Sequence, residues 1–318
     1  MIYDVIIIGS GISGSALSFI AKEYGLKVAV VEKDLIGGDI SRYGGAAALV
    51  FGEDEVLEVN KITESYFQEF WMQGAPIFNR KCLIRTNEKR FFPFAKFDKK
   101  GNLNQSCFVA NPADLAKWIF FEKIRGDIDI YEGIEAIQID HKERTLLLST
   151  GTILSFKKIF LSTGNGSISF MSSHHQKTNI LYKKLNLVLV DGLDLDNEIM
   201  NFYHDIDCYD FYLPYLDKRA FCFPINNFVD FLPNNSRDYR LNTESLLLAN
   251  TYLKELYSQH EYKIVGARTY YEVYTNKRLP NIKTDDRYSC IVFFNGFSGS
   301  GLRLSFGYAK KIIRELFP

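Results

Sequence analysis

Residues 1–45 carry a hydrophobic pattern that predicts a strand, a glycine-rich turn, a helix and a second strand. The apolar run YDVIII at residues 3–8 is typical of a buried parallel strand. The turn GSGISG at residues 9–14 leads into a helical segment at residues 15–24, and the apolar run at residues 27–31 ends on Glu32. A βαβ unit with an acidic residue at the end of its second strand is typical of dinucleotide-binding domains.

Each part of this unit has a physical role in binding a dinucleotide. Gly9 permits the tight turn, Gly11 lets a pyrophosphate approach the backbone, and Gly14 lets the helix pack closely on the strand. The helix N-terminus offers unpaired N–H groups and a partial positive charge to the phosphates. Glu32 is placed to accept hydrogen bonds from ribose hydroxyls. A lone GxGxxG is weak evidence, but this context favours a dinucleotide site over a plain βαβ turn.

Two further segments combine small residues with turns that can lie against a flat ligand. Residues 33–48 contain two glycine pairs around Ser41 and Arg42, followed by three alanines, so the backbone there supplies N–H donors without steric bulk. The alternative for this segment is a flexible surface loop. Residues 158–166 repeat the pattern of an apolar strand that ends in a small-residue turn, which can approach the same ligand.

The remaining pattern predicts a mixture of helices and strands. Apolar residues recur at helical spacing in residues 53–72 and 243–257, and Asn111 before Pro112 is a typical start for a helix that runs to about residue 123. Residues 290–294 predict a buried strand that turns through a glycine-rich segment into a helix at residues 302–316, with a plain βα unit as the alternative. Shorter strand-like runs lie at residues 76–85, 127–139, 145–149, 152–154, 187–190, 211–213, 221–223 and 264–268.

Composition and charge exclude several classes of protein. Among the 318 residues, 38 Lys and Arg balance 38 Asp and Glu, which gives no electrostatic case for nucleic acid binding. No apolar segment is long enough to span a bilayer, and no secretory signal is expected before the first strand. The five cysteines are scattered without a CxxC pair, which argues against a disulfide framework, a zinc site or a redox dithiol. The sequence predicts a cytoplasmic protein without a metal site, with His174 and His175 in a surface loop.

Six segments carry a resemblance to a known family through their order along the chain. These segments are residues 9–14 with Glu32, 37–45, 111–115, 161–164, 266–268 and 296–302. In this order they resemble the FAD-dependent oxidoreductases of the D-amino-acid oxidase family, with glycine oxidase and sarcosine oxidase as the most similar members. The FAD-binding residues that the glycine motif and the resemblance together imply are Gly9, Gly11, Ile12, Ser13, Gly14, Glu32, Lys33, Gly38, Ser41, Arg42, Gly44, Gly45, Ala46, Ile134, Thr163, Gly164, Gly296, Phe297, Ser298, Gly299, Ser300, Gly301 and Leu302.

Departures from the family pattern affect the substrate more than the cofactor. Arg268 resembles the family's arginine and is the candidate for binding a substrate carboxylate, with a structural ion pair as the alternative; Thr269 follows it where the family has proline. Tyr270 is a further candidate for the same pocket, with packing as the alternative. Ser300 replaces the usual histidine of the C-terminal turn. No cysteine lies between Arg268 and Pro280 to tether the flavin, so FAD is expected to bind non-covalently.

The resemblance implies an α/β fold in which a Rossmann-like FAD-binding domain carries an inserted, mainly antiparallel β (α+β) substrate domain. The FAD-binding domain is expected at residues 1–55, 108–169 and 265–318, and the substrate or cap domain at residues 56–107 and 170–264. Because no second GxGxxG is followed by a strand and an acidic residue, no separate NAD(P)H domain is expected.

The implied function is an FAD-dependent oxidoreductase that oxidises a C–N bond of a small amine or amino acid by hydride transfer to the flavin. One alternative is a flavoprotein that acts on a peptide or another macromolecule, for which the neutral charge disfavours tRNA. Another is a non-catalytic flavin-binding protein whose aromatic residues dock a partner. Reduction of the flavin by a small amine distinguishes the first from the others.

Overall fold

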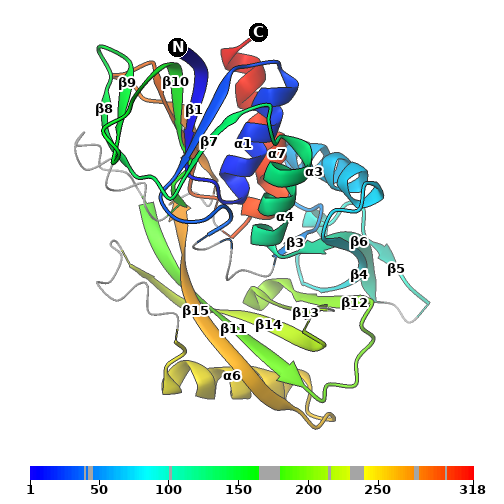
Figure 1. The fold of residues 1–318 in the computed structure, drawn as a ribbon. Helices are drawn as coiled ribbons and strands as arrows, with labels where there is room; N and C mark the ends of the chain where they lie inside the picture. Colours follow the sequence, from blue (N-terminus) through cyan, green and yellow to red (C-terminus); the bar gives the residue numbers. More distant parts are fainter. Residues whose placement is uncertain are drawn as a thin grey trace.

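The protein is built from two β-sheets, one covered by helices and one mainly antiparallel (Figure 1). The computed structural model describes residues 1–38, 41, 46–99, 102–164, 180–213, 216–229, 240–275, 279–297 and 299–318. This architecture confirms the expected fold class, a Rossmann-like domain joined to a mainly antiparallel β domain.

The first sheet has the predicted βαβ unit at its centre. Its strands are β1 (Ile2–Ile8), β2 (Val28–Glu32), β7 (Asp129–Glu132), β8 (Ala136–Asp140), β9 (Thr145–Leu148), β10 (Ile153–Leu161), β16 (Asn281–Thr284) and β17 (Ile291–Asn295). The order is β16-β17-β10-β1-β2-β7, parallel except for β16. β8 and β9 form an antiparallel extension from β10. The predicted hairpin strand at residues 152–154 and the apolar run at residues 158–161 are thus one strand, because β10 pairs with β9 at its start and β1 along its length.

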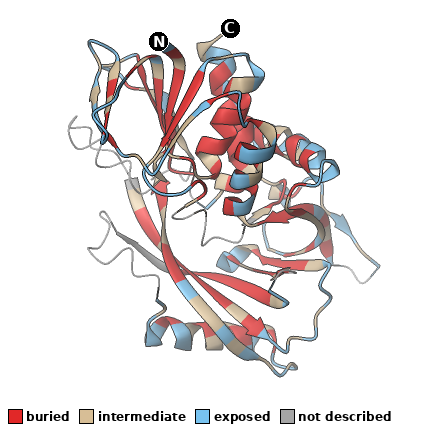
Figure 2. Ribbon diagram, in the orientation of Figure 1, coloured by how far each residue is buried: buried red, intermediate tan, exposed pale blue. Residues whose placement is uncertain are grey.

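Helices form a layer on one face of this sheet (Figure 1). They are α1 (Ile12–Glu23), α3 (Asp54–Met72), α4 (Pro112–Trp118) and α7 (Gly301–Leu316). Asn111 caps α4 as predicted, since its Oδ1 accepts the N–H of Ala113 at 2.9 Å. The predicted single helix to residue 123 changes character after Trp118, where a π-helical turn, η2 (Ile119–Lys123), begins. Figure 2 shows burial concentrated in the sheet and in α1 and α7.

Helices α3 and α7 cross at very short range. A Cβ atom on Gly307 of α7 would lie 2.2 Å from the carbonyl oxygen of Val59 in α3, so only glycine fits at this contact. The Gly307 N–H donates to Thr63 Oγ1 at 3.0 Å inside the same contact. Helix α3 therefore belongs by packing to the layer on the first sheet, although residues 56–107 were assigned to the cap domain.

The second sheet has the order β15-β11-β14-β13-β12-β4-β6-β3, with β5 paired to β6. Its neighbours are antiparallel except for β12 and β4, which are parallel. The strands are β3 (Ala46–Ala48), β4 (Ile77–Arg85), β5 (Lys96–Phe97), β6 (Leu103–Ala110), β11 (Ile180–Asp191), β12 (Ile199–Tyr203), β13 (Cys208–Leu213), β14 (Lys218–Val229) and β15 (Lys263–Thr275). Helix α6 (Thr243–Leu256) covers one face of this sheet. Strands β3 and β15 both belong to this sheet, at opposite ends of its strand order. Their residues fall largely in the ranges assigned to the FAD-binding domain, and the domain boundaries stay a prediction.

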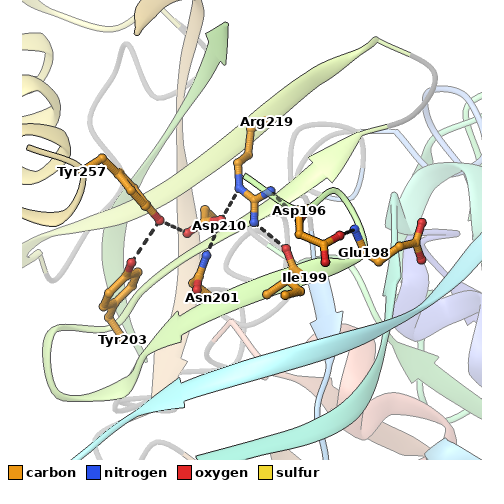
Figure 3. A network of polar contacts seen from close by, with 8 residues as sticks. All are labelled: Asp196, Glu198, Ile199, Asn201, Tyr203, Asp210, Arg219 and Tyr257. Atoms are coloured by element: carbon orange, nitrogen blue, oxygen red, sulfur yellow. Dashed lines mark hydrogen bonds and ion pairs between the residues drawn. The ribbon is translucent and has the colours of Figure 1, made fainter. Parts of the chain in front are cut away.

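A buried polar network ties β12, β13 and β14 to the end of α6 (Figure 3). Asp210 accepts hydrogen bonds from Arg219, from the Tyr257 hydroxyl and, at 3.2 Å, from Asn201 Nδ2. Arg219 also donates to the carbonyl oxygen of Ile199. The Asp210 side chain is fully buried and that of Arg219 is 4 % exposed, so the two charges are compensated inside the protein. The side chains of this network connect strands of the cap sheet and line neither of the cavities described below.

Candidate functional site

A large cavity lies at the carboxyl ends of four parallel strands of the first sheet. Its lining includes Ile8 of β1, Glu32 of β2, the residues that follow β10, and the residues that follow β17. Together with its mouth the cavity encloses about 1420 Å³. The carboxyl edge of a parallel sheet is where open α/β folds bind their ligands.

The first glycine turn has the geometry that the sequence predicts. Gly9 has φ +99°, and a Cβ atom there would lie 2.5 Å from the carbonyl oxygen of Ser162. A Cβ atom on Gly14 would lie 1.9 Å from the Gly9 carbonyl oxygen, so the helix packs directly on the turn. Gly11 lines the cavity, and a Cβ atom there would come within 3.0 Å of Ser41 Oγ. The turn therefore presents bare backbone to the cavity.

The N-terminus of α1 points its first turn at this cavity. Its N-cap residue, Gly11, has no side chain to accept the N–H groups of the turn. Ile12 N–H donates to Ser41 Oγ at 3.1 Å, and Ile12 and Ser13 both line the cavity. A helix N-terminus without a capping side chain favours an anionic ligand.

Glu32 is held rigidly at the end of β2. Its Oε2 accepts the N–H of Ser10 at 2.8 Å and the hydroxyl of Ser10 at 2.9 Å, while Oε1 accepts the N–H of Asp34 at 2.9 Å. The carboxylate lines the cavity with acceptor capacity left over. Part of its predicted ribose-binding capacity is thus used to fix the glycine turn.

The C-terminal turn between β17 and α7 forms another wall of the cavity. Gly296 and Gly299 adopt φ +70° and +73°, which favour glycine. Phe297 is buried against Phe294 with ring centroids 5.0 Å apart, which anchors the turn on the helix layer. At the end of β10, Ser162 Oγ is buried without a hydrogen-bond partner among the described residues, beside Thr163 and Gly164.

Most of the predicted cofactor residues meet at this cavity. Those that line it are Gly9, Gly11, Ile12, Ser13, Glu32, Lys33, Gly38, Ser41, Thr163, Gly164, Gly296, Phe297, Gly299, Gly301 and Leu302. Gly14 lies beneath the turn, Ala46 pairs with Ala110 between β3 and β6, and Ser300 lines a second cavity. Ile134 donates its N–H to the Glu32 carbonyl oxygen at 2.9 Å, and its neighbours Glu135 and Ala136 line the cavity in its place. Arg42, Gly44, Gly45 and Ser298 lie outside the described residues, as do His174 and His175.

A second cavity adjoins the first on the side of the cap sheet and encloses about 700 Å³ together with its mouth. Its lining combines apolar residues with Asp207, Glu272 and Arg303. Arg303, in the first turn of α7, donates to Ser300 Oγ and to the Phe51 carbonyl oxygen, each at 3.2 Å, and stacks over the Phe51 ring at 4.0 Å. Burial lowers the pKa of Arg303 to about 10, so the guanidinium stays charged at neutral pH.

No acidic residue among the described ranges forms an ion pair with Arg303. Two of its N–H groups are used by the contacts above, and a guanidinium carries five. An enclosed cation without a carboxylate partner at the wall of a cavity is a typical anion-binding group.

The structure separates the two residues that the sequence placed in the substrate pocket. Tyr270 is 2 % exposed and lines the first cavity, where burial raises its pKa well above the usual value. Arg268 is exposed on β15 and is not among the described residues that line either cavity. This placement gives no support to carboxylate binding by Arg268.

Sequence reasoning missed Glu272, Tyr209 and Arg303. Glu272 follows Tyr270 by two residues on the same strand, so the alternation of side chains in a strand puts both on one face. Arg303 directly follows the Gly301–Leu302 segment that was assigned to the cofactor. Tyr209 had no local signal, because it reaches the site through the pairing of β13 with β14.

The glycine turn at the carboxyl edge of the parallel sheet and the cavity beside it are typical of dinucleotide-binding α/β proteins, and a second cavity lined by charged residues adjoins the first. The family model described as "Pyridine nucleotide-disulphide oxidoreductase" matches residues 3–187, which is more than half of the chain. The chain therefore belongs to this family of FAD-dependent oxidoreductases.

The five cysteines are all buried and none forms a disulfide.

Solved structures of a proline dehydrogenase, a glycine oxidase and an amino acid deaminase share the fold at low sequence identity. L-proline dehydrogenase from P. horikoshii is 16 % identical, with a TM-score of 0.81 over 99 % of this chain and 93 % of that one. Glycine oxidase from Geobacillus kaustophilus is 16 % identical, with a TM-score of 0.76 over 99 % and 94 %. L-amino acid deaminase from Proteus myxofaciens is 14 % identical, with a TM-score of 0.74 over 100 % and 91 %.

A comparison with curated protein sequences found no match. None of the helices in the described ranges has the length and apolar character needed to cross a membrane.

Proposed function

We propose that this protein is an FAD-dependent enzyme that oxidises a C–N bond of a small amino acid, as a relative of the D-amino-acid oxidase family. FAD binds non-covalently in the first cavity and the substrate in the second. The observation that carries the proposal is Arg303, an enclosed cation without an acidic partner among the described residues, in a cavity that adjoins the cofactor cavity. The shared fold with amino-acid-oxidising enzymes supports it.

The first cavity has the features that FAD needs. Bare backbone at Gly11 and the uncapped α1 N-terminus accept the pyrophosphate, and Glu32 accepts hydrogen bonds from the ribose. The C-terminal turn from Gly296 to Gly301 borders the flavin end, next to the second cavity. When bound, FAD supplies an oxidised ring that accepts a hydride from the substrate carbon.

Arg303 holds the substrate carboxylate in this scheme. The contacts with Ser300 and Phe51 fix the guanidinium, which leaves N–H groups for a carboxylate in a fork geometry. A fixed carboxylate orients the α-carbon toward the cofactor and lowers the entropic cost of reaching the reactive geometry. Arg303 is therefore a binding residue with the role that the sequence assigned to Arg268.

Substitution of the two arginines separates these roles. Arg303→Gln is expected to raise KM for amino acids such as L-proline or glycine by about 100-fold, because it removes a hydrogen-bonded charge from an enclosed ligand. The amine pyrrolidine, which has no carboxylate, should be affected little. Arg268→Gln on the exposed part of β15 is the matched control and should leave KM unchanged. Steady-state reduction of a dye acceptor measures both; equal effects of the two substitutions would contradict the assignment.

A further inference from the structure

Glu272 lies at the junction of the two cavities. Among the described residues only Tyr209, Glu272 and Gly299 line both. A Cβ atom on Gly299 would lie 2.7 Å from Glu272 Oε2, so the carboxyl group rests directly against the C-terminal turn. A carboxyl group here stands between the cofactor cavity and the substrate cavity.

Glu272 has no cationic partner in the described part of the chain. Lys183 is its register partner on β11, but the Lys183 ammonium group pairs with Asp207 at 2.7 Å instead. The Tyr274 hydroxyl donates a hydrogen bond to Glu272 Oε2 at 3.2 Å. Oxygen lone pairs of Glu272 are therefore available to a ligand in the cavity.

The surroundings of Glu272 favour its protonated form at neutral pH. Burial and, next, the charge of Asp207 raise its pKa to about 8, while the Tyr274 hydroxyl and Lys183 oppose the shift. Three other titratable groups lie nearby, namely Tyr209, Tyr270 and Cys222, and their pKa values are raised, so they stay neutral. Arg303 is the cation on the wall of the second cavity.

We propose that Glu272 binds the ammonium group of the substrate and accepts its proton before oxidation. The inference rests on the proposed function, in which Arg303 holds the carboxylate of the same zwitterionic substrate. One N–H bond of the ammonium breaks, the proton moves to a Glu272 oxygen, and the electron pair stays on nitrogen. The neutral amine can then release hydride from its α-carbon to FAD, whereas an ammonium nitrogen has no lone pair to assist.

The pH dependence of kcat/KM tests this step on the FAD-loaded enzyme. With L-proline, glycine and iminodiacetate as probes, the wild type is expected to gain activity as pH rises through about 8, where Glu272 becomes ionised. In Glu272→Gln this rise near pH 8, the limb of the pH profile that we assign to Glu272, should be absent, so that kcat/KM follows only the pKa of the free amine. The value of kcat/KM at pH 8 should fall by about 100-fold. The bound-flavin spectrum of Glu272→Gln confirms that the variant is folded.

Two neighbouring substitutions should move the same limb in opposite directions. Asp207→Asn removes the negative charge that raises the Glu272 pKa, so the rise of kcat/KM shifts to lower pH. Tyr274→Phe removes the hydroxyl that favours the ionised form, so the limb shifts to higher pH. A merely structural role for Glu272 would not produce opposite shifts.

Binding of a matched ligand gives a readout without turnover. Tetrahydrofuran-2-carboxylate resembles proline but carries an ether oxygen instead of the amine, so it repels ionised Glu272. Its affinity, measured through the flavin bands, should weaken above pH 8 in the wild type and stay flat in Glu272→Gln. If substrates reduce the flavin but the pH dependence of kcat/KM and of ligand affinity is the same in Glu272→Gln as in the wild type, the inference is wrong and the proposed function stands. If no probe perturbs or reduces the flavin, the proposed function itself fails, and the inference with it.

Discussion

Glycine residues in the turns matter because they have no side chain and leave space for a ligand or for close packing. Gly11 lines the cavity at the N-cap of α1, and its φ of −61° is open to any residue, so an added methyl group changes the cavity and leaves the backbone unstrained. The Cβ atom would sit 3.0 Å from Ser41 Oγ, in the space assigned to the pyrophosphate. A substitution of Gly11 can therefore change cofactor binding without changing the stability of the fold.

Gly11→Ala is expected to weaken FAD binding by about 10- to 100-fold, because overpacking of a close contact costs about 1–3 kcal/mol. The melting temperature of the apoprotein should not change, while the rise in melting temperature on adding FAD should shrink. Thermal melts with and without FAD measure both quantities. An unchanged FAD effect would exclude this turn as the pyrophosphate site.

The positions of the glycine-turn residues at the first cavity were predictable from the sequence, whereas the lining of the second cavity was not. A glycine turn between a strand and a helix fixes its own geometry locally, so Gly9, Gly11 and Glu32 meet at the cavity as the sequence predicts. Arg268 has the correct chemistry but is exposed. Arg303 and Glu272 reach one cavity only because α7 packs beside the cap sheet, which no local pattern records.

At the level of secondary-structure elements, the cap sheet contains a buried ion pair between neighbouring strands. Asp210 of β13 and Arg219 of β14 are compensated by each other and by Tyr257 beyond α6 (Figure 3). Removal of one partner from such a pair leaves an uncompensated buried charge.

Asp210→Asn is expected to lower the free energy of unfolding by about 3–5 kcal/mol. The matched control is Glu55→Gln, which breaks the exposed pair between Lys311 and Glu55 at 2.6 Å and should cost less than about 1 kcal/mol. Urea denaturation measures both variants. Equal losses would show that the Asp210 network does not hold the cap sheet together.

Elements were predicted better than their membership in sheets. Strands β1, β2 and β17 and helices α1, α3 and α7 follow from apolar periodicity, and Asn111 marks the start of α4. Residues 265–275 were assigned to the FAD-binding domain, yet β15 pairs along its length with β11 in the second sheet. Pairing between strands about eighty residues apart depends on tertiary packing, which periodicity does not encode.

The fold of the whole molecule places the C-terminal turn between the two cavities. The turn after β17 borders the cavity at the edge of the parallel sheet, and Gly299 lies against Glu272 of the cap sheet. One loop thus faces both the cofactor site and the proposed substrate site. This arrangement is the one that the proposed oxidation needs, because it puts the proposed cofactor and substrate sites next to each other.

FAD binding and amino acid oxidation are tested together by the visible spectrum of the purified protein, recorded without oxygen before and after adding glycine, L-proline or iminodiacetate. We expect the protein to show the bands of oxidised flavin, to release free FAD on denaturation, and to lose these bands on adding at least one of the amino acids. A protein that carries no flavin and cannot be reconstituted with FAD would contradict the proposed function.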